Sequence, residues 1–280
     1  LLGDKVELPR AEVGDVTGDG LPDLYVTNYL LYDITKHEPC FQRTVELYCG
    51  PQPYRGAPDR LYANRGGGKF EDVTATSFAQ PTDGKGLAVA MCDVDHDGDL
   101  DIYVANDQTP NFLWQNDGKG RFKNIADIAG VAASKDALMQ SGMGVAFADY
   151  DNDLLEDIVV TNFEDQVNSV YKNDGDGFFS EVSYQTGIGY ESRPFLGWGV
   201  AMVDFDRDGF KDLVFANGHI YDNAHLLADN SSWSQKSRLH LNDGKGAFLK
   251  AEGSGGAAFA EKRVSRGLLW GDIDQDGDID

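Results

Sequence analysis

Aspartates recur along this chain in five nine-residue clusters whose spacing suits a hard cation. The template is D-x-D-x-D-G-x-x-D, with oxygen-bearing side chains at positions 1, 3, 5 and 9 and glycine at position 6. Calcium binds about six to eight oxygens at ~2.3–2.6 Å, which a tight loop can bring together. The spacing predicts up to five calcium sites, each completed by the backbone carbonyl at position 7. The predicted ligands are Asp15, Thr17, Asp19, Asp23, Asp93, Asp95, Asp97, Asp101, Asp149, Asp151, Asp153, Asp157, Asp204, Asp206, Asp208, Asp212, Asp272, Asp274, Asp276 and Asp280.

Two clusters depart from the template. Thr17 replaces an aspartate in the first cluster, and Leu154 replaces the glycine in the third, where a distorted turn and weaker affinity are expected. Magnesium suits the clusters less well, because it demands a stricter octahedron and keeps its waters. The alternative to metal binding is a series of solvated turns capped by aspartate side chains. Five copies at near-regular spacing favour the metal.

The net negative charge of the chain is what bound metal cations would neutralise. The chain has 280 residues, with 47 acidic against 24 basic residues and a net charge of −23. This balance argues against nucleic acid and against anionic membrane surfaces, since both are bound through Lys and Arg. The acids lie in short spaced clusters rather than in one acidic block. Five calcium ions would add ten positive charges and change −23 to −13.

A second pattern follows four of the clusters: an asparagine, a glycine-rich turn and then a phenylalanine. We name the asparagines the anchor asparagines: Asn64, Asn116, Asn173 and Asn242. From each anchor to the next cluster the distance is 29, 33, 31 and 30 residues, whereas from cluster to anchor it is 49, 23, 24 and 38. One half of the repeat is therefore constant in length, and the other half absorbs insertions, as loops on one face of an array do.

The runs around each cluster predict short strands. Apolar runs such as GLAVAMCD, GMGVAFAD, GWGVAMVD and RGLLWGD precede the clusters, and LDIYVAN, EDIVVTN and KDLVFAN follow them. The NDGKG stretches predict hairpin loops between two further strands. Residues 126–141 are the best helical candidate. Four strands per repeat of roughly 55 residues predict an all-β fold, a β-propeller with four-stranded blades and a calcium loop in each blade.

The organisation predicted is one propeller region over residues 1–280 with about four to five blades. The chain opens at Leu1 without an initiator methionine and stops at Asp280 inside a cluster, so both ends are expected to be cut from a longer protein. A propeller needs about 4–8 blades, and more blades are expected in the whole protein. No apolar run approaches the ~20 residues that span a bilayer.

These motifs resemble a known family. The D-x-D-x-D-G-x-x-D clusters between strands are similar to the FG-GAP/VCBS repeats of integrin-α-type propellers. The segments GWGVAMVDFDRDGFKDLVFANGHIYDN and CGPQPYRGAPDRLYANRGGGKFEDVT resemble the ASPIC/UnbV and cartilage-acidic-protein group. The resemblance spans nearly the whole chain. It implies an extracellular protein, secreted or at the cell surface, in adhesion or matrix contexts, although the group's C-terminal module is not visible in this sequence.

Three cysteines are too few for a disulfide scaffold. Cys40 and Cys49 lie close together in a loop rich in proline and tyrosine, and can bridge a local hairpin in an oxidising compartment. Cys92 ends an apolar run and is expected to be a buried small hydrophobe. A zinc site is not expected, because there is no CxxC motif and the histidines do not cluster with these thiols.

Two long inserts offer places for a partner. The first, Tyr29 to Pro58, carries Tyr32, Phe41, Tyr48 and Tyr54; the second, His219 to Ser237, carries Tyr221, His225 and Trp233. Exposed aromatics on loops can anchor a protein or a sugar, but they also pack under their own loop. Asn230 opens an N-glycosylation sequon in the second insert.

Three functions stay open at this point. The first is a calcium-rigidified adhesion or assembly module, non-catalytic, with a protein partner or self-assembly. The second is a lectin-like, carbohydrate-binding propeller. The third is a sugar lyase or hydrolase that uses His219, Tyr221, Asp222 and His225 for acid–base chemistry. The sequence contains no nucleophile elbow, P-loop or HExxH motif, so a non-enzymatic module is expected.

Overall fold

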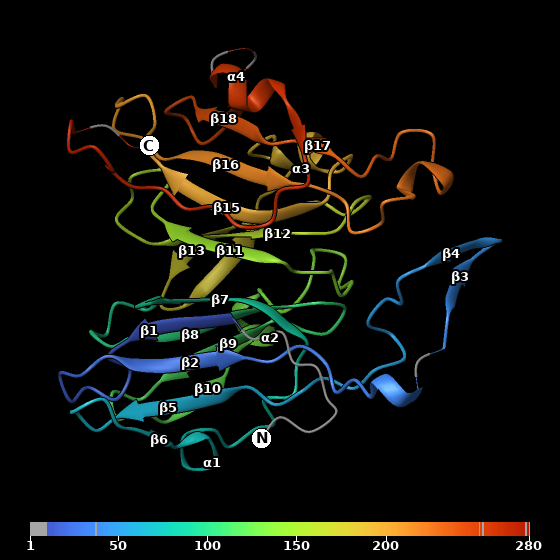
Figure 1. Ribbon diagram of the computed structural model, residues 1–280. Helices are drawn as coiled ribbons and strands as arrows, with labels where there is room; N and C mark the ends of the chain where they lie inside the picture. Colours follow the sequence, from blue (N-terminus) through green and yellow to red (C-terminus); the bar gives the residue numbers. More distant parts are fainter. Residues whose placement is uncertain (1–9, 37, 252, 254, 278, 280) are drawn as a thin grey trace. The chain divides into compact units, whose positions relative to one another are not determined.

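The computed structural model describes residues 10–36, 38–251, 253, 255–277 and 279. In this part of the chain, four antiparallel sheets of four strands account for most of the regular structure (Figure 1). The predicted all-β class is therefore confirmed. The chain forms two compact units, each described here by itself. The first holds most residues up to Met143 together with 173–180, and the second holds 144–172, 181 onward and 41–47.

Each of the four sheets is a simple meander, in which the strands pair in chain order. The first sheet comprises β1 (Arg10–Gly14), β2 (Asp23–Thr27), β5 (Arg60–Asn64) and β6 (Phe70–Asp72), and the second comprises β7 (Gly86–Cys92), β8 (Asp101–Asn106), β9 (Phe112–Asn116) and β10 (Phe122–Asn124). The third comprises β11 (Gly144–Ala148), β12 (Asp157–Thr161), β13 (Ser169–Gly175) and β14 (Phe178–Glu181), and the fourth comprises β15 (Gly197–Val203), β16 (Asp212–Asn217), β18 (Arg238–Asn242) and β19 (Phe248–Lys250).

Smaller elements lie between and after these sheets. Two further sheets have two strands each, β3 (Cys40–Gln42) with β4 (Val45–Leu47), and β17 (Gln235–Lys236) with β20 (Lys262–Arg263). One short helix follows the last strand of every four-stranded sheet: α1 (Thr74–Ser77), α2 (Ala126–Ala129), α3 (Ile188–Ser192) and α4 (Gly256–Ala260). The 3-10 turns are η1 (Ile34–Lys36) and η2 (Ala224–Leu226). The predicted inserts lie between the second and third strands of the first and fourth sheets.

Each unit has its own apolar core. The second strands β8, β12 and β16 are buried at every residue, which explains their continuous apolar sequences. In the first unit Tyr25, Phe78, Trp114 and Phe122 pack together, and Phe78 stacks on Phe122. In the second unit the core is formed by Tyr150, Val159, Val170, Ile188, Met202, Leu213, Phe215 and Phe248.

Two local predictions fail. Helix α2 covers only the first residues of the stretch 126–141, because its C-cap Gly130 adopts a left-handed conformation with φ of 83° and ends the helix. The run RGLLWGD (266–272) forms no strand in the described part of the chain, although its counterparts do. Each counterpart pairs with the strand that follows its aspartate cluster, and in the described part of the chain residues 266–272 have no such partner strand.

A buried carboxylate in the first unit makes stability pH-dependent. Asp59 is fully buried, and its oxygens accept hydrogen bonds from Tyr25 Oη (2.9 Å) and the Asn28 amide (2.8 Å). Burial raises the pKa of Asp59 to about 7, and the negative charge of Asp83 acts in the same direction. The two hydrogen bonds and the positive charge of Arg60 lower the pKa, but by less. The folded chain thus holds this proton more tightly than the unfolded chain.

The free energy of unfolding should therefore fall as the pH rises from about 4 to about 7, and should not change through this group below about 4. Asp59→Asn keeps the size of the side chain and removes its charge. Urea unfolding in EDTA at pH 5 and pH 8 should show the wild type losing about 2–4 kcal/mol more than the variant over this interval. Equal pH dependence in both proteins would contradict an ionising Asp59.

Candidate metal centres

The first four aspartate clusters form the turns between the first and second strands of the four-stranded sheets (Figure 1). We name them loop 1 (15–23), loop 2 (93–101), loop 3 (149–157) and loop 4 (204–212), with loop 5 (272–280) following β20. Loops 1 to 4 lie at the same end of equivalent strand pairs. A strand, a nine-residue turn and a second strand thus repeat as one local unit, as the spacing predicted.

Within each loop, the aspartates at positions 1 and 5 hold the turn in place. The position 1 carboxylate accepts hydrogen bonds from the amides at positions 5 and 6 in all five loops, at 2.7–3.1 Å. The position 5 carboxylate of loops 1 to 4 accepts the amide at position 7. These short-range bonds explain why the loop conformation follows from the motif alone.

The position 9 aspartate has a second role that the sequence reasoning missed. Asp23, Asp101, Asp157 and Asp212 are at most 1% exposed. In loop 2, Asp101 accepts hydrogen bonds from the amides of Val94 (3.1 Å) and of the anchor Asn116 (2.8 Å). Asp23 and Asp212 bind the corresponding amides in their own sheets. Position 9 therefore ties the start of the loop to the third strand.

Carboxylate oxygens converge at positions 1, 3 and 9 in three loops. The converging groups are Asp93, Asp95 and Asp101, then Asp149, Asp151 and Asp157, then Asp204, Asp206 and Asp212, with one oxygen of each residue within 4.8 Å of the others. In loop 5 the group is Asp272, Asp274 and Asp276; Asp280 lies outside the described residues. Two ligands on opposite sides of one calcium ion are separated by about 4.6–5.2 Å, so these distances fit one ion.

Position 5 of loops 2 to 4, and the whole of loop 1, stand apart from these groups. Among the described residues, Asp97, Asp153 and Asp208 are not members of the converging groups, and no group of three acids forms from Asp15, Asp19 and Asp23. In loop 1 the position 3 oxygen belongs to the hydroxyl of Thr17. The number of filled sites, up to five, stays a prediction.

The loops contain buried oxygens that a cation would satisfy. Of the loop oxygens that the structure describes at positions 3 and 7, four are buried and make no hydrogen bond: Thr17 Oγ1, Asp95 Oδ1, Asp99 Oδ1 and Asp151 Oδ1. A buried oxygen without a partner is costly, and three of these four occupy position 3. The donor set is all oxygen, as calcium prefers, so the residues fit this metal.

Charge accumulates in loop 2. Burial, and then the charges of Asp97, Asp95 and Asp93, raise the pKa of Asp99 to about 6. Burial also raises the pKa of Asp101 to about 7, although two backbone hydrogen bonds oppose it. Both carboxylates are therefore harder to ionise in the folded chain than in water.

Loop 3 differs from loop 2 in its charge balance. Lys172, the residue before the anchor Asn173, donates from Nζ to Asp151 and, at 2.5 Å, to Asp153. These acids occupy positions 3 and 5. Partial burial opposes both shifts, but the ion pairs raise the pKa of Lys172 and lower that of Asp153. At the equivalent place in loop 2, the neutral Gln115 donates to Asp95 at 2.6 Å.

The third loop keeps the turn conformation of the other loops, although a distorted turn was expected. Instead, the backbone of Leu154 adopts a conformation that is unfavourable for a residue with a side chain. The glycines at position 6 have φ of 85–99°, and Leu154 adopts the same left-handed region with φ of 73°. Its side chain is 80% exposed and adds little burial. A residue with a β-carbon is strained in this region by about 1–2 kcal/mol.

Leu154→Gly should therefore raise the free energy of unfolding by about 0.5–1 kcal/mol, after the greater freedom of glycine in the unfolded chain is subtracted. Urea unfolding in EDTA measures the change. Leu155→Gly is the matched control: Leu155 has no positive φ, and the same replacement there should lower stability. A loss of stability in both variants would argue against strain at position 6.

The anchor asparagines connect neighbouring repeats. Asn116 Nδ2 donates to the carbonyl of Leu100 in its own sheet (3.0 Å) and to that of Val16 in loop 1 (2.9 Å). Asn242 Nδ2 does the same with Lys211 (3.1 Å) and with Tyr150 in loop 3 (2.8 Å). The partner in the preceding repeat is always the carbonyl at position 2. The recurrence of asparagine was the sequence signal, but its partner was not predicted.

The histidines of the second insert lie in different surroundings, one buried and one exposed. His219 is buried; its Nδ1 accepts the Tyr221 amide at 3.0 Å, and its ring packs against Phe163 and Tyr221. Burial lowers the pKa of His219 to about 4. Glu164 lies 3.4 Å from its Nε2. His225, by contrast, is exposed on the 3-10 turn η2.

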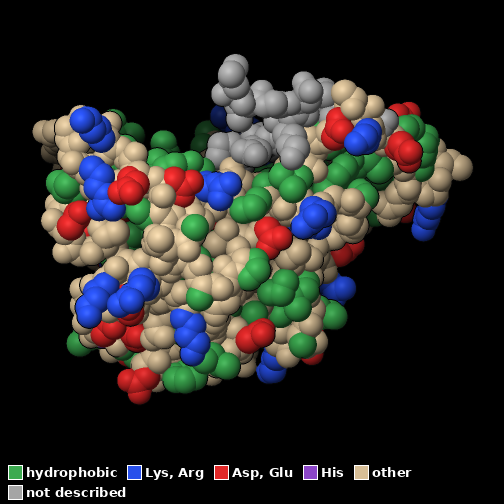
Figure 2. All heavy atoms as spheres, turned by 90° about the horizontal axis from the view of Figure 1, so that it is seen from below, with side chains coloured by type: hydrophobic (Ala, Val, Ile, Leu, Met, Phe, Trp, Pro, Cys, Tyr) green, Lys and Arg blue, Asp and Glu red, His purple; other side chains and the backbone are tan. Residues whose placement is uncertain are grey.

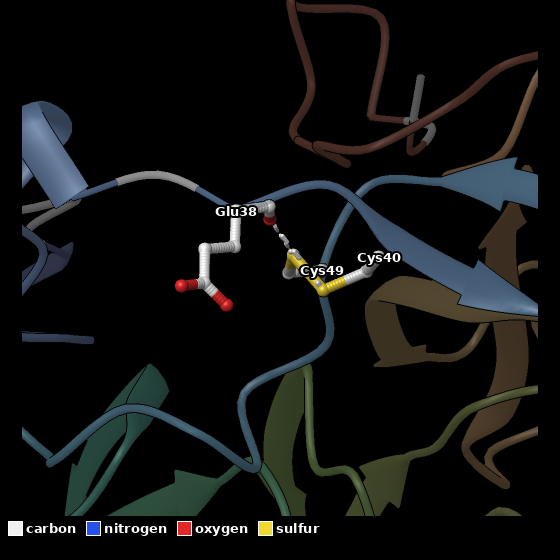
Figure 3. The surroundings of a disulfide bond; sticks show 3 residues. All are labelled: Glu38, Cys40 and Cys49. Atoms are coloured by element: carbon white, nitrogen blue, oxygen red, sulfur yellow. Dashed lines mark hydrogen bonds between the residues drawn. A yellow bond between two sulfur atoms is a disulfide. The ribbon is translucent and has the colours of Figure 1, made fainter.

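The first insert contains the disulfide that the sequence allowed. Cys40 and Cys49 are bonded and close the hairpin of β3 and β4, and Figure 3 shows the Glu38 carbonyl oxygen, 3.3 Å from Cys49 Sγ. Cys92 is half-buried at the end of β7. Phe41 and Tyr48 are 61% and 69% exposed. Part of this insert's aromatic content therefore faces solvent, whereas Tyr32 and Tyr54 pack edge to face.

Acidic side chains do not gather into one patch on the face shown in Figure 2, where they alternate with Lys and Arg. No helix among the described residues is long and apolar enough to cross a bilayer.

Comparison with known proteins finds a family match. A model described as FG-GAP-like repeat matches residues 44–104, 93–160 and 149–215. Cartilage acidic protein 1 from Homo sapiens and from Xenopus tropicalis is homologous to the chain and 28% identical over 183 residues. Each match covers 62% of this chain and 26% of the relative, so the chain spans about a quarter of these relatives.

Similar solved structures are more distant. They include the exotype rhamnogalacturonan lyase YesX, with 12% identity and a TM-score of 0.41 over 85% of this chain and 48% of the other. The V. cholerae biofilm matrix protein Bap1 has 14% identity and a TM-score of 0.40 over 88% of this chain and 39% of the other.

Proposed function

Because the chain belongs to the family of proteins built from FG-GAP-like repeats, we propose that it is a calcium-binding structural module of an extracellular protein. One observation carries the proposal: oxygens at positions 1, 3 and 9 of loops 2 and 4 converge within 4.8 Å. Calcium would be held there by Asp93, Asp95 and Asp101, and by Asp204, Asp206 and Asp212. Its chemistry would be charge neutralisation, which fixes each loop against its sheet.

The arrangement of the sheets also supports the proposal that the chain is part of a β-propeller. Four equivalent meanders of four strands, each with its turn motif at the same strand junction, are what the blades of a propeller require. In such an array, calcium stiffens the strand junction of each blade. The module would then present its inserts on a rigid scaffold.

An extracellular setting is supported by two observations. The Cys40–Cys49 disulfide forms in oxidising compartments, and the homologous curated proteins bear the name cartilage acidic protein. The hairpin that this disulfide closes presents Phe41 and Tyr48 to solvent, as protein-binding surfaces present aromatics. The proposal therefore includes a protein partner at this hairpin and no catalytic step.

Equilibrium dialysis of the full chain against calcium, after treatment with EDTA, tests the proposal. We expect at least two calcium ions per chain at millimolar concentration, the range of extracellular modules, and no displacement by an equal concentration of magnesium. Asp95→Asn and Asp206→Asn should each remove one ion. A chain that binds no calcium at millimolar concentration would refute the calcium function.

A further inference from the structure

The residue before each anchor asparagine occupies one equivalent place in the third strand of its sheet. In the four repeats it is Ala63, Gln115, Lys172 and Leu241. In the second and third repeats, the side chain at this place reaches position 3 of the aspartate loop. In these two repeats, the residue type at this position therefore determines which group of the third strand contacts the loop carboxylates.

Only the third repeat puts a positive charge at this place. Lys172 Nζ lies against Asp151 and Asp153, at positions 3 and 5, and its side chain is 28% exposed. The two bonds take up one oxygen of each acid; Asp151 is half-buried, whereas Asp153 is more exposed. A calcium ion using the same oxygens would stand next to the ammonium, and like charges at such distances repel strongly.

We propose that the ammonium of Lys172 stands in for calcium in loop 3, so that this loop keeps its fold without the metal and binds calcium more weakly than loops 2 and 4. The inference rests on the proposed calcium function and deepens it. Under this proposal, loops 2 and 4 take calcium from solution, whereas loop 3 is neutralised by the ammonium of Lys172, which belongs to the chain itself.

The residue at position 6 also distinguishes loop 3 from the loops proposed to need calcium. Position 6 is Leu154 instead of glycine, yet the turn retains the left-handed conformation of the other loops. The loop is thus held closed in spite of local strain, and a covalently attached cation is present at all calcium concentrations. Asp151 Oδ1 still makes no hydrogen bond, which marks the oxygen that calcium would reach if the lysine were removed.

Two reciprocal variants test the inference in the full chain. Lys172→Gln removes the charge, and Leu241→Lys places an ammonium at the same position of the fourth repeat. Lys172→Gln should lower the unfolding midpoint in EDTA by several degrees and should make one calcium site about tenfold tighter. Leu241→Lys should weaken one calcium site by a similar factor. Thermal unfolding and equilibrium dialysis provide the two measurements.

Lys135→Gln is the control, because Lys135 is exposed in the turn region after α2, outside the aspartate loops and the strands that flank them. It should change neither measurement. Asp149→Asn should leave the number of tightly bound calcium ions unchanged. The inference is overturned if Lys172→Gln behaves like Lys135→Gln in EDTA, or if Asp149→Asn removes one tightly bound ion.

The two proposals can fail separately. If the chain binds no calcium, the proposed function is refuted by dialysis, while the unfolding midpoint of Lys172→Gln in EDTA still decides whether the ammonium stabilises loop 3. If calcium binds to loop 3 of the wild type as tightly as to loop 2, the calcium function stands and the role of Lys172 is wrong.

Discussion

Calcium should raise the unfolding midpoint of this chain by about 10–20 °C over its value in EDTA. At one hundred times its dissociation constant, a ligand contributes about 2.7 kcal/mol per site, and loops 2 and 4 together contribute about 5 kcal/mol. A stabilisation of 1 kcal/mol moves the midpoint by about 2–4 °C in domains approaching this size. Differential scanning calorimetry at about 10 mM calcium measures the shift.

The loop responsible is identified by a substitution that preserves shape. Asp95→Asn keeps the acceptor for Gln115 but removes one negative charge from the converging group of loop 2. It should halve the calcium-dependent shift and leave the midpoint in EDTA unchanged or slightly raised, since repulsion within the loop falls. Magnesium at equal concentration should produce little shift. If magnesium reproduces the whole shift, the sites are not selective for calcium.

Removing the buried aspartate at position 9 should destabilise the chain even without metal. Asp101→Ala leaves the amides of Val94 and Asn116 without their acceptor in a buried place. Each unsatisfied buried donor costs about 1–3 kcal/mol, so the free energy of unfolding should fall by about 2–6 kcal/mol. Urea unfolding in EDTA isolates this effect from calcium binding.

Two further variants sharpen this prediction. Asp212→Ala should cause a loss of similar size, because Asp212 accepts the amides of Phe205 and Asn242 at 2.8 Å each. Asp101→Asn keeps one acceptor oxygen and should cost about half as much. If Asp101→Ala is as stable as the wild type in EDTA, position 9 acts as a metal ligand alone, and the hydrogen bonds contribute nothing measurable.

The parts of the fold that the sequence predicted well depend on short-range interactions. The turn of each aspartate loop is held by bonds from position 1 to positions 5 and 6, so the nine-residue motif contains its own folding information. The hairpins after the anchor asparagines are likewise local; in the third repeat, Asp176 and Gly177 turn with positive φ between β13 and β14. Pattern and structure agree there because few distant residues are involved.

The parts that were missed depend on residues far apart in the chain. The second role of Asp101 requires Asn116, and a strand at RGLLWGD requires a partner strand, as its counterparts have. Lys172 is different, because aligning the four repeats shows it as the only charged residue among its equivalents. The signal was present, but only the structure shows that its side chain reaches the acids of loop 3.

The hydrogen bonds of the anchor asparagines always run backward along the chain. Val16 in loop 1 is bonded by Asn116, 100 residues later, and Tyr150 in loop 3 by Asn242, 92 residues later. Synthesis proceeds from the N-terminus. The position 2 carbonyl of a loop therefore gains its asparagine partner only when the third strand of the next repeat has left the ribosome. Maturation should advance one repeat behind translation, with the newest loop always the least protected part of the nascent chain.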